Sequence, residues 1–194
     1  MSLLTVGSVA YDVIELPCQD PVEVLGGSAT WFCTAASLFT RPALVGVVGQ
    51  DFLVDDVAFL EGRGVDVEGL DRKPGTTFRW HGRYHDDMIG RDSLKTELGV
   101  FGDFSPIVPK GKRAPDILFL GNIKPSLQNL VLAQCREARF VGLDTIQIWI
   151  DLCRDELMRL MDRVDLLFLN DDEVRQLSGE RNVFTGARRL LEAG

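Results

Sequence analysis

Short uninterrupted runs of apolar residues alternate along the chain with segments in which apolar residues recur every three or four positions. The apolar runs lie at 3–9, 43–48, 117–120, 140–143 and 166–169. Because successive positions are apolar, these runs predict strands covered on both faces, as in a parallel sheet. The helical stripes consist of Ala29, Phe32, Cys33 and Ala36, of Leu127, Leu130 and Val131, and of Phe184, Ala187, Leu190 and Leu191. The alternation predicts an α/β fold with a wound, mostly parallel sheet flanked by helices.

The stretch from Thr76 to Phe104 breaks this rhythm, because its apolar and polar residues alternate with a period of two. One predicted strand face carries Phe78, Trp80 and Tyr84, and the other carries Thr77, Arg79, His81, Arg83 and His85. We interpret the stretch as a small β-sheet lid inserted into the α/β body and joined by residues 12–18. The expected body comprises 1–11, 25–72 and 105–194, and the expected lid comprises 12–24 and 73–104.

Charge and composition narrow the possible partners. The 194 residues include 21 Lys plus Arg and 29 Asp plus Glu, which gives a formal net charge of −8. An acidic surface repels phosphate backbones, so we expect no nucleic-acid partner. Neither a membrane-spanning apolar run nor a signal peptide is present in the sequence, and we expect a cytoplasmic protein without membrane contact. The four cysteines are widely spaced, and we interpret them as reduced thiols.

Polar residues follow three of the predicted strands. Asp12 comes after the first strand, Asn122 after the strand that ends at Leu120, and Asp144 after the strand that ends at Leu143. Open α/β sheets bind ligands at the carboxyl ends of their strands, so these three side chains could line one crevice. A carboxylate at position 12 could accept hydrogen bonds from a pair of hydroxyls, or it could be an exposed turn residue.

The glycine pair Gly26-Gly27 precedes a predicted helix. Such a pair permits a positive φ and lets a ligand approach the bare amides at the helix N-terminus, where the helix dipole favours oxygen-rich groups. The alternative is a tight turn with Ser28 as the N-cap.

Three further polar groups have plain structural interpretations beside functional ones. Asn170 and Glu173, in the segment Asn170-Asp171-Asp172-Glu173, fit a capping box at a helix start or a metal or phosphate role. Asp51 precedes a helical segment, so we expect it to cap that helix. His81 and His85 lie on one predicted strand, roughly 13 Å apart, which is too far for one metal ion, and we interpret them as lid or surface residues.

Together these motifs resemble the ribokinase-like carbohydrate kinases of the PfkB family. The matching segments are Gly7-Ser8-Val9-Ala10-Tyr11-Asp12, Gly26-Gly27-Ser28-Ala29-Thr30, Val45-Gly46-Val47-Val48-Gly49-Gln50-Asp51-Phe52, Gly64-Val65-Asp66-Val67 and Asn170-Asp171-Asp172-Glu173. They occur in the family's order along the whole chain. The resemblance implies an α/β body with a β lid, and a phosphotransferase that moves the γ-phosphoryl group of ATP, with Mg²⁺, to a sugar or nucleoside hydroxyl.

The resemblance also implies roles for individual residues. Asp12, Gly26 and Gly27 would hold substrate hydroxyls, and Asn122 and Asp144 are further candidates in the same cleft. Asn170 and Glu173 would organise ATP phosphates and Mg²⁺, with Glu173 acting through a water, as suits a cation that keeps part of its hydration shell. Exposed lid edges favour a homodimer through the lid.

Two features depart from the family's pattern. Trp31 stands where the family often has an asparagine that contacts sugar, so the substrate cannot be transferred from ribokinase. The family's DTxGAGD-like segment, with its catalytic Asp, is absent from these 194 residues and is expected beyond Gly194. Asn182 and Gly194 fit the start and stop of a last helix that should return to another strand. We therefore expect an N-terminal kinase portion that is inactive alone.

Two other functions stay open from the sequence. One is a non-catalytic sugar-binding or dimerisation module that uses the same cleft and lid. The other is a nicotinamide-dependent oxidoreductase, although the sequence has no GxGxxG fingerprint.

Overall fold

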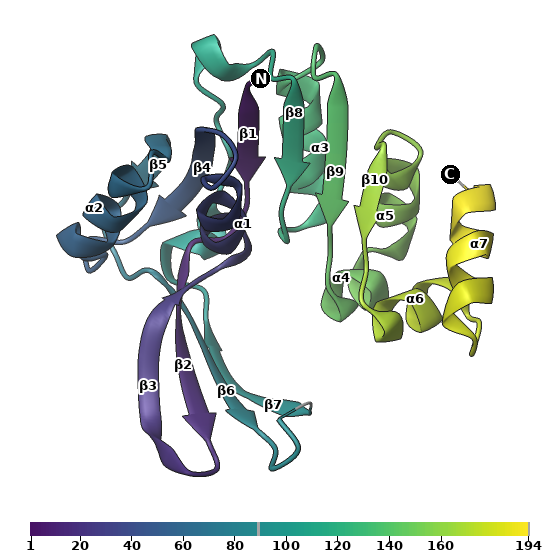
Figure 1. Cartoon of the computed structure of the whole chain (residues 1–194), viewed down its shortest axis with the longest axis horizontal. Coiled ribbons are helices and arrows are strands. Elements are labelled where there is room, and N and C mark those ends of the chain that lie inside the picture. The colour runs from purple at the N-terminus through teal and green to yellow at the C-terminus, as the bar shows by residue number, and fades with distance from the viewer. Residues whose placement is uncertain (89, 194) are drawn as a thin grey trace.

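The body of the molecule is a six-stranded parallel sheet flanked by helices (Figure 1). The computed structural model describes residues 1–88 and 90–193. The strand order is β10-β9-β8-β1-β4-β5. The strands are β1 (Leu3–Val6), β4 (Pro42–Val48), β5 (Asp66–Arg72), β8 (Ile117–Leu120), β9 (Phe140–Asp144) and β10 (Leu166–Phe168). All five apolar runs therefore form body strands, and the predicted wound α/β fold is confirmed.

Helices cover both faces of the body sheet. They are α1 (Ser28–Ala36), α2 (Val54–Gly62), α3 (Pro125–Gln134), α4 (Gln147–Leu152), α5 (Arg154–Met161), α6 (Asp171–Ser178) and α7 (Val183–Ala193). Figure 1 shows α1 in front of the sheet and α3 and α5 behind it. Cys33 of α1 and Leu60 of α2 share one apolar cluster with Leu44, whereas Val131 of α3 and Leu157 of α5 belong to the other. Most of the sheet is thus buried on both sides, as its apolar runs predict. The edge strand β10 is an exception, because Leu166 and Phe168 are exposed.

A second sheet of four strands forms the lid, in the order β3-β2-β6-β7. Its strands are β2 (Ala10–Leu16), β3 (Gln19–Gly26), β6 (Phe78–Tyr84) and β7 (Arg91–Glu97). The lid projects from the end of the body where the parallel strands finish (Figure 1). The lid strands β2 and β3 extend two residues beyond the predicted lid segment 12–24, at Ala10 and Gly26.

The strand register confirms that the lid has two different faces. Asp12 lies beside Val24 on β3 and Trp80 on β6, and Ile14 lies beside Val22 and Gly82. Side chains of paired residues share a face of the sheet. Asp12 therefore belongs to the aromatic lid face, whereas its neighbour Tyr11, paired with Arg79, belongs to the charged one.

The short helices after the lid, the start of the last helix and the cysteines complete the description of the fold. Two short 3₁₀ helices, η1 (Gly99–Asp103) and η2 (Lys110–Lys112), follow the lid. Asn182 accepts a hydrogen bond from the Thr185 amide at 3.1 Å, as an N-cap does, whereas Gly194 lies outside the described residues. Cys33 and Cys135 are buried free thiols. Among the helices of residues 1–88 and 90–193, none is long and apolar enough to cross a membrane.

Candidate functional site

Asp12 and Gly26 are in close contact where the lid leaves the body. A Cβ atom on Gly26 would lie 2.2 Å from Asp12 Oδ2, so only glycine leaves room for this carboxylate. Burial raises the pKa of Asp12 above its ordinary value. The sequence separates the two residues by a hairpin, and the pairing of β2 with β3 brings them together.

Gly27 turns the chain from the lid strand β3 into helix α1. Its φ of 97° is a conformation that side-chain-bearing residues rarely adopt, and a Cβ atom there would lie 2.4 Å from the Ser8 carbonyl oxygen. Gly27 is itself the N-cap of α1, so the alternative that made Ser28 the cap is wrong. The Ser28 hydroxyl instead accepts a hydrogen bond from the Ser8 amide at 3.3 Å.

Asn122 follows on the body side of this glycine turn. A Cβ atom on the preceding Gly121 would lie 2.8 Å from Ser28 Oγ, so the end of β8 sits against the start of α1. The Asn122 side-chain oxygen accepts a hydrogen bond of 2.8 Å from Trp149 Nε1. The backbone amide of Asn122 lies close enough to the carboxylate of Asp144 to lower the pKa of that group, so the ends of β8 and β9 are adjacent.

Gln128 of α3 is a supporting residue that the sequence analysis missed. Its side-chain nitrogen donates to the carbonyl oxygens of Gly121 at 2.9 Å and Asp144 at 2.8 Å. Gln128 is fully buried, and it holds the backbone next to two candidate residues on neighbouring strands. Nothing in the helical stripe of α3 distinguishes this glutamine from an ordinary exposed one.

Asp144 and Glu173 form a partly buried pair of carboxylates. Burial first, and then the charge of Glu173, raise the pKa of Asp144 to about 6. Burial also raises the pKa of Glu173, although hydrogen bonds from Asn170 oppose it. The predicted capping box is confirmed, because the Glu173 amide donates to Asn170 Oδ1 and the Asn170 amide donates to Glu173 Oε2, each at 2.9 Å.

These contacts connect the candidate residues along one edge of the body. Asp12 contacts Gly26, and Gly27 caps α1. Asn122 lies beside Asp144, whose pKa is raised by the charge of Glu173. The carboxyl ends of parallel strands are the usual ligand-binding edge of an open α/β sheet. Asp12 and Gly26 are in contact at the root of the lid, and Asn122, Asp144 and Glu173 lie close together at the ends of β8, β9 and β10.

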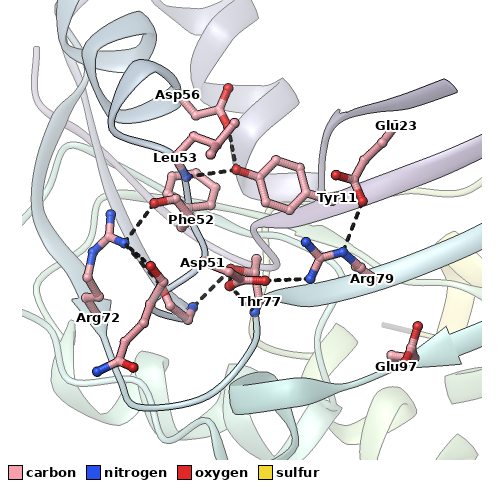
Figure 2. Close-up of polar contacts among 12 residues, drawn as sticks. Tyr11, Glu23, Asp51, Phe52, Leu53, Asp56, Arg72, Thr77, Arg79 and Glu97 are labelled. Carbon is pink, nitrogen blue, oxygen red and sulfur yellow. Dashed lines mark hydrogen bonds and ion pairs between the residues drawn. The ribbon is translucent and has the colours of Figure 1, made fainter.

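Asp51 plays a different part from the one predicted. It does not cap α2, whose N-cap is Leu53. Its carboxylate instead accepts hydrogen bonds from the amide and hydroxyl of Thr77, each at 2.7 Å, and from Arg79 Nη1 at 2.6 Å (Figure 2). Thr77 and Arg79 lie 26 and 28 residues further along the chain, so local capping rules cannot detect these contacts.

The two lid histidines each meet a carboxylate. His81 Nε2 lies 2.8 Å from Glu15 Oε1, and His85 Nε2 lies 3.2 Å from Asp92 Oδ2. Within the described residues there is no group of three or more His, Cys, Asp or Glu side chains that could hold a metal ion. The histidines thus fit the lid role that the sequence analysis gave them.

This α/β body with its separate β lid is a ribokinase-like fold. The family model described as "pfkB family carbohydrate kinase" matches residues 2–193, and the chain therefore belongs to this family.

Similar proteins include kinases of different substrates. The chain is 27% identical over 195 residues to a cytidine kinase of Thermococcus kodakarensis, covering 98% of this chain and 69% of that protein. A fructokinase structure from Halothermothrix orenii matches with a TM-score of 0.78 at 15% identity, covering 100% of this chain and 77% of its own. An E. coli structure described as "putative Ribokinase II", in complex with ATP and Mg²⁺, matches with a TM-score of 0.75 at 17% identity. The match covers 100% of this chain and 70% of that one.

The carboxylate pair fits the magnesium ion that the family implies. Mg²⁺ keeps several waters and binds proteins through one or two carboxylates together with substrate phosphates. Glu173 offers one such carboxylate, and its charge raises the pKa of the nearby substrate candidate Asp144. A divalent cation held by Glu173 through a water would relieve this repulsion.

Proposed function

We propose that this chain forms the substrate-binding part of a kinase that transfers the γ-phosphoryl group of ATP to a hydroxyl of a sugar or nucleoside. The observation that carries the proposal is the contact of Asp12 with Gly26 beside the Gly27 turn. The partly buried carboxylate accepts hydrogen bonds from substrate hydroxyls, and the backbone of the glycine pair lets the substrate approach closely. Asn122 and Asp144 complete the substrate edge.

Asn170 and Glu173 would hold the magnesium ion and the phosphates, with Glu173 acting through a water. Mg²⁺ would neutralise negative charge that develops on the transferred phosphoryl group. The chain's own contribution is to orient these groups, because the capping box fixes both side chains at the start of α6. Phosphoryl transfer depends chiefly on such positioning and charge stabilisation.

The 194-residue polypeptide should turn over little ATP. The sequence contains no DTxGAGD-like segment, which in the family supplies the catalytic Asp and a helix N-terminus for the anionic transition state. General-base and electrostatic effects each contribute orders of magnitude in rate. We therefore infer that the polypeptide binds substrate without catalysing its phosphorylation at an ordinary kinase rate.

Calorimetric titration of the 194-residue chain with a panel of nucleosides and sugars tests substrate binding. We expect at least one compound to bind, and Asp12→Asn to weaken that binding by about tenfold or more, since it removes a charged hydrogen-bond acceptor. Asp20→Asn is the matched control, because Asp20 is an exposed carboxylate of the same lid. Equal losses in both variants, or no binding to any compound, would contradict the proposal. An ATP turnover of a few per second or more would contradict the inactivity.

The lid offers a surface through which two copies of the chain could form a homodimer. The same surface would serve the alternative function, a non-catalytic dimerisation module. The lid has two edge strands, β3 and β7, and Val22 on β3 is 40% exposed. Unpaired strand edges and exposed apolar residues favour association with a second lid. Light scattering at several concentrations tests this: a monomer at every concentration would contradict it.

No observation favours the alternative of a nicotinamide-dependent oxidoreductase. A cytoplasmic location remains a prediction from the sequence.

A further inference from the structure

One body loop, residues 49–53, contacts the lid strands β2 and β6 directly and is linked to β3 through Arg79. We call it the clamp loop. Its carboxylate, Asp51, accepts hydrogen bonds from Thr77 and Arg79 at the start of β6. Arg79 continues the connection, because its Nε donates to Glu23 Oε2 on β3 at 3.0 Å (Figure 2). The guanidinium thus bridges a body carboxylate and a lid carboxylate, with a different nitrogen for each.

A tyrosine makes a second connection to the same loop. The Tyr11 hydroxyl on β2 accepts a hydrogen bond from the Leu53 amide at 3.0 Å and donates to Asp56 Oδ2 at 2.5 Å. Burial first, and then the hydrogen bond to Asp56, raise the pKa of Tyr11 to about 12, so the hydroxyl keeps its proton. The Arg79 guanidinium lies 5.2 Å from the centre of the Tyr11 ring, so the two connections also touch each other.

The clamp loop is itself held firmly by the body. Arg72 Nη1 on β5 donates to the carbonyl oxygens of Gly49 at 3.2 Å, Gln50 at 3.3 Å and Phe52 at 2.8 Å. A Cβ atom on Gly49 would lie 2.4 Å from the Gly75 carbonyl oxygen, so the loop is pressed against the chain that leads into β6. Asp51 is therefore presented to the lid from a fixed position.

The clamped lid residues are direct neighbours of the site residues. Tyr11 precedes Asp12 on β2, and Arg79 precedes Trp80 on β6. Successive side chains point to opposite faces of a strand. The clamp therefore grips the charged face of the lid at the same two positions where the other face carries Asp12 and an aromatic ring.

We propose that Asp51 is a positioning residue that, with Arg79, fixes the angle of the lid on the body and thereby the place of Asp12 beside the glycine pair. The effect on Asp12 as a substrate ligand rests on the proposed function, whereas the fixing of the lid does not. The lid strands have few buried residues of their own, and every residue of β7 is exposed. A sheet with so little buried area depends on specific contacts at its root for its orientation.

A distance measurement between spin labels tests the clamp in the whole 194-residue chain. The exposed native Cys18, at the turn between β2 and β3, takes one label, and Asp162→Cys at the exposed end of α5 takes the other. Cys153→Ser removes the half-exposed thiol, while Cys33 and Cys135 are buried. Asp51→Asn removes the charge that Arg79 faces and should broaden or shift the distance distribution.

Hydrogen exchange on the same variants gives the size of the effect. We expect lid amides in β2 and β6 to exchange about twofold faster in Asp51→Asn, because a partly exposed hydrogen bond to a charged group is lost, while β8 and β9 stay unchanged. Asp71→Asn is the matched control, since Asp71 pairs with Lys73 at 3.7 Å within the body. Arg79→Lys, which keeps the charge but loses the forked geometry, should give a smaller change and serves if Asp51→Asn does not fold.

Unchanged distances and exchange in folded Asp51→Asn, or equal changes in Asp71→Asn, would overturn the proposal. Both measurements are made without substrate. A chain that binds no sugar or nucleoside but loses its lid orientation in Asp51→Asn would therefore refute the proposed function and support the clamp. Where a ligand does bind, Asp51→Asn should weaken it while Asp71→Asn leaves its affinity unchanged.

Discussion

The two sheets of this molecule are held in place by different kinds of interaction. In the body sheet, Leu118 and Leu120 are fully buried between layers of helices. In the lid, Glu15 binds His81 at 2.8 Å and Arg83 at 2.6 Å, and these polar pairs lie on an open surface. Apolar burial is strong and without direction, whereas exposed polar contacts are weak but specific in geometry. The body thus supplies stability, and the lid supplies a surface whose orientation can be adjusted by few contacts.

The largest expected effect is the difference in unfolding free energy lost when an apolar residue is truncated in the body sheet and in the lid. Leu118→Ala in the body should lower the free energy of unfolding by about 2–5 kcal/mol, because it leaves a cavity in a closely packed core. Ile14→Ala in the half-buried lid should cost only about 1 kcal/mol, since less apolar area is lost. Urea unfolding of both variants measures the difference. Equal losses would show that the lid is as tightly packed as the body.

The next effect concerns ligand binding at the junction of the two sheets. Gly26→Ala places a methyl group where Asp12 Oδ2 now lies and should weaken binding of the calorimetric ligand by about tenfold or more. The unfolding free energy of the body should change little, because the displaced carboxylate is only partly buried. Gly62→Ala is the matched control, since a Cβ atom there meets nothing within 4 Å. Full affinity in Gly26→Ala would show that Asp12 does not contact the ligand.

The sequence predicted the five body strands with continuous apolar residues and missed the sixth, β5, which mixes apolar with polar residues. Every apolar run became a body strand, since continuous apolar residues are what a covered parallel strand requires. The strand β5 lies at one end of the sheet, and no predicted strand covers Asp66–Arg72, because polar residues interrupt any apolar run there. The strand at the other end, β10, was predicted because Leu166–Leu169 are all apolar.

In the candidate site, contacts between residues close in sequence could be predicted, whereas contacts between residues far apart in sequence could not. The capping box of Asn170 and Glu173 was predictable, because its partners are three residues apart. The bonds of Asp51 with Thr77 and Arg79 were not, because only the folded lid brings these segments together. Local patterns therefore predicted the contacts within one helix start, whereas contacts between distant segments needed coordinates.

The smallest effect tests whether the clamp between the sheets is electrostatic. Burial alone would raise the pKa of Asp51 above its ordinary value of 3.8, but hydrogen bonds from Arg79 and Thr77 outweigh burial and lower it. A carboxyl group whose pKa is lower in the folded state stabilises the fold above its unfolded pKa, and this contribution is lost as the pH falls through the folded pKa.

The unfolding free energies of the wild type and Asp51→Asn, measured from pH 7 to pH 3, should therefore differ by a constant amount above about pH 5. The gap should narrow below pH 3.8, the ordinary value for this carboxyl group. Because Asp51 is partly exposed and screened by solvent, we expect a gap of about 0.5 kcal/mol. Glu15, Glu23 and Asp56 are the other carboxylate residues around the clamp, and both proteins contain them, so the difference between the proteins reports chiefly on Asp51. A gap that stays constant down to pH 3 would mean that Asp51 holds the lid by shape and neutral hydrogen bonds rather than by its charge.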